Sequence, residues 1–150
     1  MVIITAKKGD KLALIEYFKH YSNDNFIKKR VECYLEHNST IIAKENNKII
    51  GMLQWYVKEN PNSGVAEFEE VFVNKEERGK GIATKLVQKA IKEVNLFFKK
   101  NNIKPRKIFL FVSKNNKSAR RLYESNGFKF IAELNNLFSE DNELFYCLNL

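Results

Sequence analysis

Residues 71 to 100, VFVNKEERGKGIATKLVQKAIKEVNLFFKK, contain the pattern on which the rest of the chain depends. The apolar run Val71 to Val73 predicts a strand, a charged segment with Gly79 and Gly81 follows, and a long amphipathic segment begins at Ile82. From there on, apolar residues recur at helical spacing, so one face of the expected helix packs and the other meets water. The sequence therefore predicts a strand, a glycine loop and a helix, in that order.

The glycine loop has the chemistry of an anion-binding turn. Gly79 and Gly81 flank Lys80 and lack Cβ atoms, so the backbone can turn sharply and its N–H groups can approach a ligand. The first turn of the helix adds unpaired N–H groups and a positive dipole end. A Walker loop is absent, and a dinucleotide fingerprint would need glycine at Thr84. A phosphate cradle and a plain glycine-containing turn both remain open on this loop alone.

Two motifs resemble those of one known family. The pattern R-x-x-G-x-A, from Arg78 to Ala83, resembles the acyl-CoA pyrophosphate loop of the GNAT superfamily of N-acetyltransferases. The segment from Asn116 to Phe128, NKSARRLYESNGF, follows a strand-like run and is similar to the family's second acetyl-CoA motif, N-x-x-A-x-x-L-Y-x-x-x-G-F. The resemblance covers nearly the whole chain and is strongest from Glu67 to Phe128.

The expected elements follow the order β-α-α-β-β-β-α-β-α-β-β, which is that of the GNAT fold. This is an α/β (α+β) fold with a central mixed, mostly antiparallel sheet of about seven strands flanked by about four helices. Asp10 is the expected N-cap of the first helix, and the second helix is expected from about Asp24 to His37. The remaining strands are expected in STIIAKE, KIIGMLQWYVK, VAEFEEVFV, KIFLFVS, GFKFIAEL and ELFYCLNL, together with a helix from Asn116 to Asn126.

Length and composition predict one domain over residues 1–150. The chain has 150 residues, 44% hydrophobic and 29% charged, as in soluble globular proteins. No apolar run approaches the ~20 residues that span a bilayer, so no membrane association is expected. The N-terminal segment is too briefly apolar for a signal peptide, and Cys33 and Cys147 form neither a metal-ligand spacing nor a disulfide framework. A cytoplasmic location is therefore expected.

The formal net charge of +8 raises the question of nucleic-acid binding. The lysines are scattered along the whole chain, and no arginine-rich tract is interleaved with aromatic residues. Acidic residues cluster at Glu67, Glu69 and Glu70. This distribution argues against a nucleic-acid partner. The phosphates of coenzyme A offer another match for basic residues within the motifs, although each of these is equally explained as a solvated side chain: Lys80, Lys117, Arg120 and Arg121.

The resemblance implies acetyl-CoA as cosubstrate and no metal. It assigns backbone groups of the strand before the loop to the pantetheine arm, and the loop itself to the pyrophosphate. A backbone N–H near Val71 to Val73 would also polarise the thioester carbonyl. The residues that it implies for acetyl-CoA binding are Val71, Phe72, Val73, Arg78, Gly79, Lys80, Gly81, Ile82, Ala83, Thr84, Asn116, Ala119 and Arg120.

Tyr123 matches the position of the family's general acid, which protonates the departing thiolate. The alternative for Tyr123 is a packed aromatic side chain. The acceptor amine, with a pKa near ~10, must lose a proton before it attacks, which calls for a base. The candidates are Glu69, which we favour, and Glu67 and Glu70; regular strand alternation does not aim them cleanly, and a β-bulge would re-aim one of them. For each of the three, a merely solvated strand carboxylate is the alternative.

The sequence thus predicts an acetyl-CoA-dependent N-acetyltransferase that acts by direct attack of a primary amine. The acceptor is open between a polyamine, a small-molecule amine and a protein amine, and the acidic strand favours a cationic one. A non-catalytic acyl-CoA-binding or sensor module is the alternative function. A homodimer is compatible with the resemblance, because many members of the family are dimers.

Overall fold

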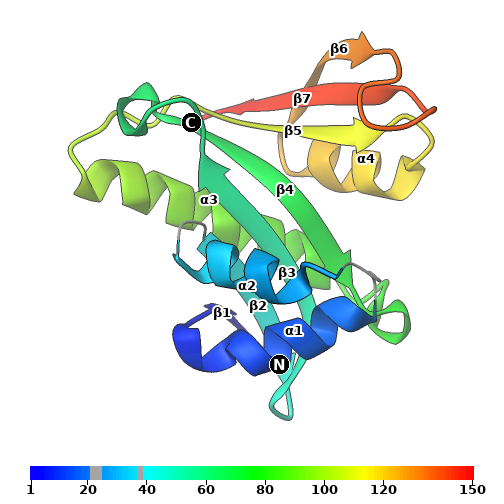
Figure 1. The fold of residues 1–150 in the computed structure, drawn as a ribbon. Helices are drawn as coiled ribbons and strands as arrows, with labels where there is room; N and C mark the ends of the chain where they lie inside the picture. The colour runs from blue at the N-terminus through cyan, green and yellow to red at the C-terminus, as the bar shows by residue number, and fades with distance from the viewer. Residues whose placement is uncertain (21–24, 37–38) are drawn as a thin grey trace. The chain divides into compact units, whose positions relative to one another are not determined.

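The computed structural model describes residues 1–20, 25–36 and 39–150. Its strands and helices follow the predicted order (Figure 1). The strands are β1 (Val2–Thr5), β2 (Ser39–Glu45), β3 (Lys48–Val57), β4 (Val65–Val73), β5 (Lys107–Ser113), β6 (Lys129–Leu134) and β7 (Glu143–Asn149). The helices are α1 (Lys11–Lys19), α2 (Ile27–Glu36), α3 (Ile82–Lys100) and α4 (Lys117–Ser125), with short 3-10 turns at Lys8–Asp10, Pro61–Ser63 and Lys75–Glu77.

The described strands form one seven-stranded sheet with the order β1-β2-β3-β4-β5-β7-β6. The pairs β1–β2, β2–β3, β5–β7 and β6–β7 are antiparallel, whereas β4 and β5 are parallel. The parallel pair is joined by a crossover that contains α3, as a parallel connection requires. The predicted mixed, mostly antiparallel sheet and its four helices are confirmed.

The chain divides into two compact units with interleaved segments. Unit 1 comprises Met1–Tyr56 and Glu70–Ala90, and unit 2 comprises Val57–Glu69 and Ile91–Leu150. No helix in the described ranges is long and apolar enough to cross a membrane.

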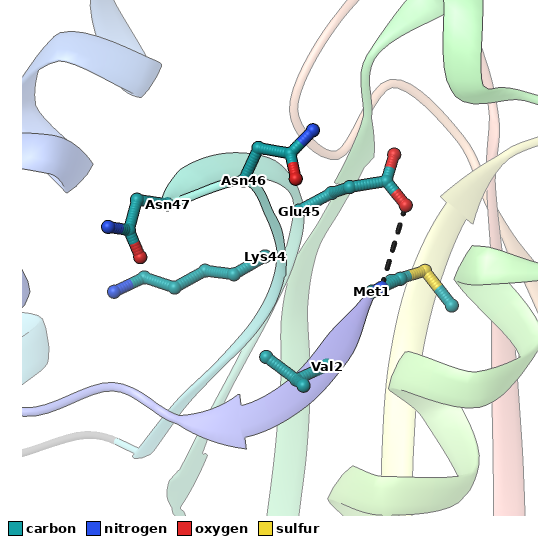
Figure 2. A pocket seen from close by; sticks show the side chains of 6 residues that line it. All are labelled: Met1, Val2, Lys44, Glu45, Asn46 and Asn47. Carbon is teal, nitrogen blue, oxygen red and sulfur yellow. Dashed lines mark ion pairs between the residues drawn. The ribbon is translucent and has the colours of Figure 1, made fainter.

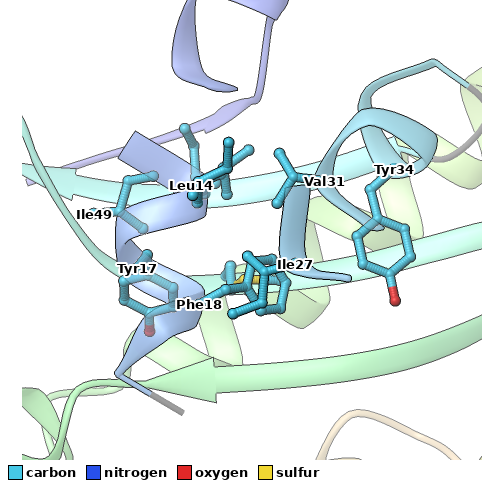
Figure 3. Close-up of a cluster of buried hydrophobic side chains, with 10 residues drawn as sticks. Leu14, Tyr17, Phe18, Ile27, Val31, Tyr34 and Ile49 are labelled. Carbon is cyan, nitrogen blue, oxygen red and sulfur yellow. The ribbon is translucent and has the colours of Figure 1, made fainter. Parts of the chain in front are cut away.

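The core of unit 1 forms where α1 and α2 pack on strands β2 and β3. Figure 3 shows side chains from both helices gathered between them, among them Leu14 and Phe18 of α1 and Val31 of α2. The rings of Phe18 and Tyr34 stack with their centroids 6.1 Å apart. These aromatic side chains of the helical pair therefore serve the core.

The start of α1 differs from the predicted cap. Asp10 does precede the helix, but its side chain makes no capping bond to it. The carboxylate instead accepts a hydrogen bond from the main-chain N–H of Lys7 at 2.9 Å and another from the ammonium of Lys44 on β2. The predicted cap is therefore absent, because the fold brings Lys44 to the Asp10 carboxylate, which local sequence patterns predict to cap the helix. The predicted ends of the second helix, Asp24 and His37, lie outside the described residues.

The core of unit 2 forms on one face of strands β5 and β7. Their register pairs Leu110 with Tyr146 and Val112 with Leu144, and these four side chains are buried. The hydroxyl of Tyr146 donates to Glu124 Oε1 of α4 at 2.7 Å, so α4 covers this face. Successive strand residues point to opposite faces. The other face therefore carries Phe109, Phe111 and Phe145.

Those three rings and Phe138 of the β6–β7 loop form a connected aromatic surface, which we call the phenylalanine face. Phe111 stacks on Phe145 with centroids 5.2 Å apart, and Phe109 contacts both rings at 5.9 and 5.7 Å. Phe138 meets Phe111 edge-on at 5.6 Å and is 69% exposed. Unit 2 thus has a buried aliphatic and aromatic side under α4 and a half-buried aromatic side opposite to it.

Candidate active site

The glycine loop in unit 1 has the backbone that the sequence predicts. Gly79 and Gly81 have φ values of +80° and +74°, which lie in the left-handed region that favours glycine. No atom lies within 4 Å of the position that a Cβ would take at either residue. Glycine is thus required by the backbone conformation, and the space beside it is open to a ligand.

Unpaired backbone donors line the start of α3. The N–H of Lys85 donates to the Gly81 carbonyl oxygen at 3.1 Å, which begins the helical hydrogen bonding. Within the described residues, the N–H groups from Gly79 to Thr84 have no hydrogen-bond acceptor. These donors and the positive end of the α3 dipole converge on the same loop, which suits a phosphate group. The predicted role of Gly79, Lys80, Gly81, Ile82, Ala83 and Thr84 toward the pyrophosphate remains a prediction that this backbone is compatible with.

Two charged side chains of the loop already have partners in the chain. Arg78 Nε donates to the carbonyl oxygen of Val73 at 3.1 Å and so ties the loop to the end of β4. Lys80 Nζ lies 2.8 Å from Glu77 Oε2, and this hydrogen bond raises the lysine pKa. The Lys80 ammonium is fully exposed, so the pair is a weak, screened one. Their predicted roles toward coenzyme A remain predictions.

The strand that leads into the loop is divided between the two units. In unit 2, Val65 to Glu67 of β4 pair in parallel with β5, and β4 continues to Val73 in unit 1. Val73 is buried and Phe72 packs against the unit 1 core, so Val71 to Val73 are held firmly.

The second motif in unit 2 forms α4 with defined caps. Asn116 is the N-cap, and its Oδ1 accepts from the N–H of Ala119 and from Ser118 Oγ, both at 3.1 Å. At the other end, Gly127 has a φ of +89°, and the N–H of Phe128 donates to the Tyr123 carbonyl oxygen at 3.1 Å. This matches a glycine-terminated helix. The motif residues thus fix the helix that carries Tyr123.

Tyr123 is 6% exposed and packs edge-on against Phe128, which in turn packs against Phe68 of β4. Burial raises the pKa of the phenol above its ordinary value. In the described part of the chain its hydroxyl has no hydrogen-bond partner. A phenol that stays protonated at neutral pH is suited to donate a proton and unsuited to act as a base.

Arg120 turns toward its own unit. Its Nη1 donates to the carbonyl oxygen of Lys114 at 3.3 Å. The hydroxyl of Tyr146 on β7 donates to Glu124 Oε1, which fastens α4 to the sheet. The sequence did not indicate this contact, because Tyr146 lies more than twenty residues away from Glu124 along the chain. The predicted contact of Arg120 with coenzyme A remains a prediction.

The three candidate bases have different surroundings. Glu67 is 9% exposed and pairs with Lys58 Nζ at 2.7 Å. Glu70, in unit 1, lies 3.6 Å from Arg30 Nη1. Glu69 is exposed and has no hydrogen bond or ion pair with any described residue. Glu69 is therefore the one of the three that has no described partner. Which of them is the base, and the bulge that would re-aim one of them, remain predictions.

A fourth carboxylate was not predicted. Glu143 is the first residue of β7, and it is buried on the side of the phenylalanine face. The signal in the sequence was its position at the head of the apolar strand ELFYCLN, where alternation places it with Phe145.

A pocket in unit 1 is lined by other residues. Figure 2 shows it at the β2–β3 turn, where Glu45 pairs with the N-terminal amine of Met1 at 3.5 Å. Its lining contains none of the predicted site residues; it consists of Met1, Val2, Lys44, Glu45, Asn46 and Asn47.

Comparisons with solved structures place the fold among acetyltransferases. The ribosomal-protein-S18-alanine N-acetyltransferase of Escherichia coli is similar over 99% of this chain and 92% of its own, with 17% identity and a TM-score of 0.79. An aminoglycoside 6′-N-acetyltransferase solved with coenzyme A is similar over 99% of this chain and 97% of its own, with 15% identity and a TM-score of 0.80. A third similar structure is a Salmonella typhimurium protein described as a candidate acetyltransferase and solved with its cofactor acetyl-CoA. The similarity covers 99% of this chain and 93% of that protein, with 20% identity and a TM-score of 0.79.

No curated protein matches the sequence. The model of the acetyltransferase (GNAT) family matches residues 9–128, a span that includes both the glycine loop and the α4 motif. The chain therefore belongs to the acetyltransferase (GNAT) family.

Proposed function

We propose that the protein is an N-acetyltransferase that transfers the acetyl group of acetyl-CoA to a primary amine. The observation that carries the proposal is the glycine loop, where two left-handed glycines with open space beside them expose the free N–H groups of the α3 start. This arrangement fits a pyrophosphate. Family membership and the coenzyme A and acetyl-CoA complexes of similar structures support it.

The residues of the chain take the following parts in this proposal. The loop binds the pyrophosphate, and backbone groups of β4 at Val71 to Val73 bind the amide groups of the pantetheine arm. A backbone N–H of Val71 to Val73 stabilises the negative charge that develops on the thioester oxygen. Glu69 removes a proton from the acceptor ammonium, directly or through water, so that the neutral amine can attack.

Tyr123 completes the reaction. The neutral amine attacks the thioester carbon and forms a tetrahedral intermediate, and the carbon–sulfur bond breaks when this intermediate collapses. The departing thiolate takes the proton of the Tyr123 hydroxyl, and the nitrogen of the new amide loses its second proton to water. Burial raises the pKa of the phenol, which keeps the group protonated at neutral pH but makes it a weaker acid toward the thiolate. The acid role therefore rests on the position of Tyr123 in the α4 motif. Bulk water reprotonates the phenolate. Both cysteines are free thiols, which is compatible with a cytoplasmic location.

The test is an assay of free coenzyme A thiol released from acetyl-CoA in the presence of a panel of primary amines. We expect amine-dependent release above the rate without amine. Binding of acetyl-CoA by calorimetry without any amine-dependent release would instead indicate the non-catalytic acyl-CoA-binding module. Absence of acetyl-CoA binding would overturn both functions.

A further inference from the structure

Thr40 and Gln54 are two polar residues inside the core of unit 1. They are 2% and 0% exposed. Their strands, β2 and β3, are antiparallel, and the register places the two residues directly opposite each other. Residues in such a pair have their side chains on the same face of the sheet, with Cβ atoms roughly 5 Å apart. The two polar side chains are therefore neighbours in a buried part of the sheet.

The polar atoms of both side chains have no hydrogen-bond partner among the residues that the structure describes. These atoms are the hydroxyl oxygen of Thr40 and both the nitrogen and the oxygen of the Gln54 amide. A buried hydroxyl or amide that has left water and gained no other partner destabilises the folded state. Most buried polar side chains do have a partner, and ordered water supplies it where protein groups do not.

The chemistry of this site is that of one hydroxyl and one amide. The next pair along the two strands on the same face is Ile42 with Met52. Both of these side chains are fully buried and belong to the unit 1 core beside α1 and α2. Thr40 and Gln54 carry no charge and together offer donors as well as acceptors. The pair thus suits a small neutral molecule that both donates and accepts hydrogen bonds.

We propose that Thr40 and Gln54 bind ordered internal water, of which one molecule bridges the Thr40 hydroxyl and the Gln54 amide. The two side chains do not hydrogen-bond each other although they are cross-strand neighbours, so a bridging molecule is needed to join them. Water is small enough for a buried site, and one molecule makes about three hydrogen bonds. The bridge links β2 to β3 through their side chains. The inference does not rest on the proposed function, because the site needs neither acetyl-CoA nor an amine.

The direct test is a crystal structure of the protein alone, at a resolution that shows ordered water. We expect a water within about 2.7–3.2 Å of both Thr40 Oγ1 and one amide atom of Gln54. Electron density without a water between the two side chains would overturn the inference, whether they then hydrogen-bond each other or remain apart.

A double-mutant cycle tests the same site in solution. Thr40→Val removes the hydroxyl, Gln54→Met removes the amide, and each keeps a side chain of similar shape. Each single variant loses one side of the bridge, so we expect its Tm to fall by about 2–4 °C. The double variant has no polar group left to satisfy, and its Tm should fall by clearly less than the sum of the two. Additive losses, or a raised Tm in either single variant, would contradict a shared water.

Two further variants serve as controls for this cycle. Gln88 is an exposed residue of α3, so Gln88→Met makes the same chemical change outside the site. Its effect on the Tm should add to that of Thr40→Val, because the two residues share no water. Thr40→Ser retains the hydroxyl and should retain the bridging water in its own crystal structure. Loss of that water in Thr40→Ser would show that the hydroxyl does not hold it and would overturn the inference.

Discussion

The ring of Tyr123 packs edge-on against the ring of Phe128, with centroids 5.7 Å apart and an interplanar angle of 64°. The same two residues are joined by a main-chain hydrogen bond of 3.1 Å that ends α4. The ring of Tyr123 is therefore fixed by packing, while its hydroxyl has no protein partner in the described residues. Ring and hydroxyl can thus be tested separately.

Tyr123→Phe keeps the packed ring and removes the proton donor. We expect an unchanged Tm and acetyl-CoA affinity, with kcat reduced roughly 10²-fold, the scale of a lost general acid. Burial raises the pKa of the phenol above the ordinary tyrosine pKa of ~10. The kcat of the wild type should therefore show no loss from ionisation of Tyr123 up to a pH equal to that ordinary pKa. A kcat within about twofold of the wild type, when chemistry limits the rate, would remove the acid role.

Gly81→Val adds a β-branched side chain at a left-handed residue beside open space. We expect the KM for acetyl-CoA to rise by about tenfold or more. Gly81→Asn distinguishes the effect of backbone strain from that of a side chain filling the space beside the loop. Asparagine tolerates the left-handed region but still has a side chain. Gly9→Val is the control, since Gly9 also has open space but no positive φ. Unchanged calorimetric binding in both Gly81 variants would remove the loop from the proposed site.

Glu69→Gln should lower activity most near neutral pH, and the difference in activity from the wild type should become smaller as the pH rises. The reason is that the acceptor amine deprotonates unaided at higher pH and no longer needs a base. The pH profiles of kcat/KM for Glu69→Gln, Glu67→Gln and Glu70→Gln should be compared. If the recovery at high pH appears in one of the other two variants, the base is that residue.

Asn116 caps α4 through its side-chain oxygen. Asn116→Ala should lower the free energy of unfolding by about 1 kcal/mol, whereas Asn116→Ser retains a capping oxygen and should be close to the wild type in denaturant unfolding. If the amide also contacts acetyl-CoA, the KM for acetyl-CoA should rise in the Ser variant too. A normal KM in Asn116→Ser would limit Asn116 to its capping role.

The sequence by itself determined the features that depend on neighbouring residues. The order of strands and helices, the left-handed glycines of the loop and the caps of α4 at Asn116 and Gly127 all follow from local periodicity and backbone preference. These signals act over a few residues, so they can be recognised without knowing the fold.

Only the tertiary structure decided which side chains meet. Asp10 looked like a cap, but Lys44 of β2 lies against its carboxylate. Glu67, Glu69 and Glu70 look alike in the sequence, yet Lys58 and Arg30 engage two of them and leave Glu69 without a described partner. The burial of Glu143 depends on the pairing of β7 with β5, which are separated by α4 and β6 along the chain. Burial and charge pairing depend on such long-range contacts, and local sequence patterns do not specify them.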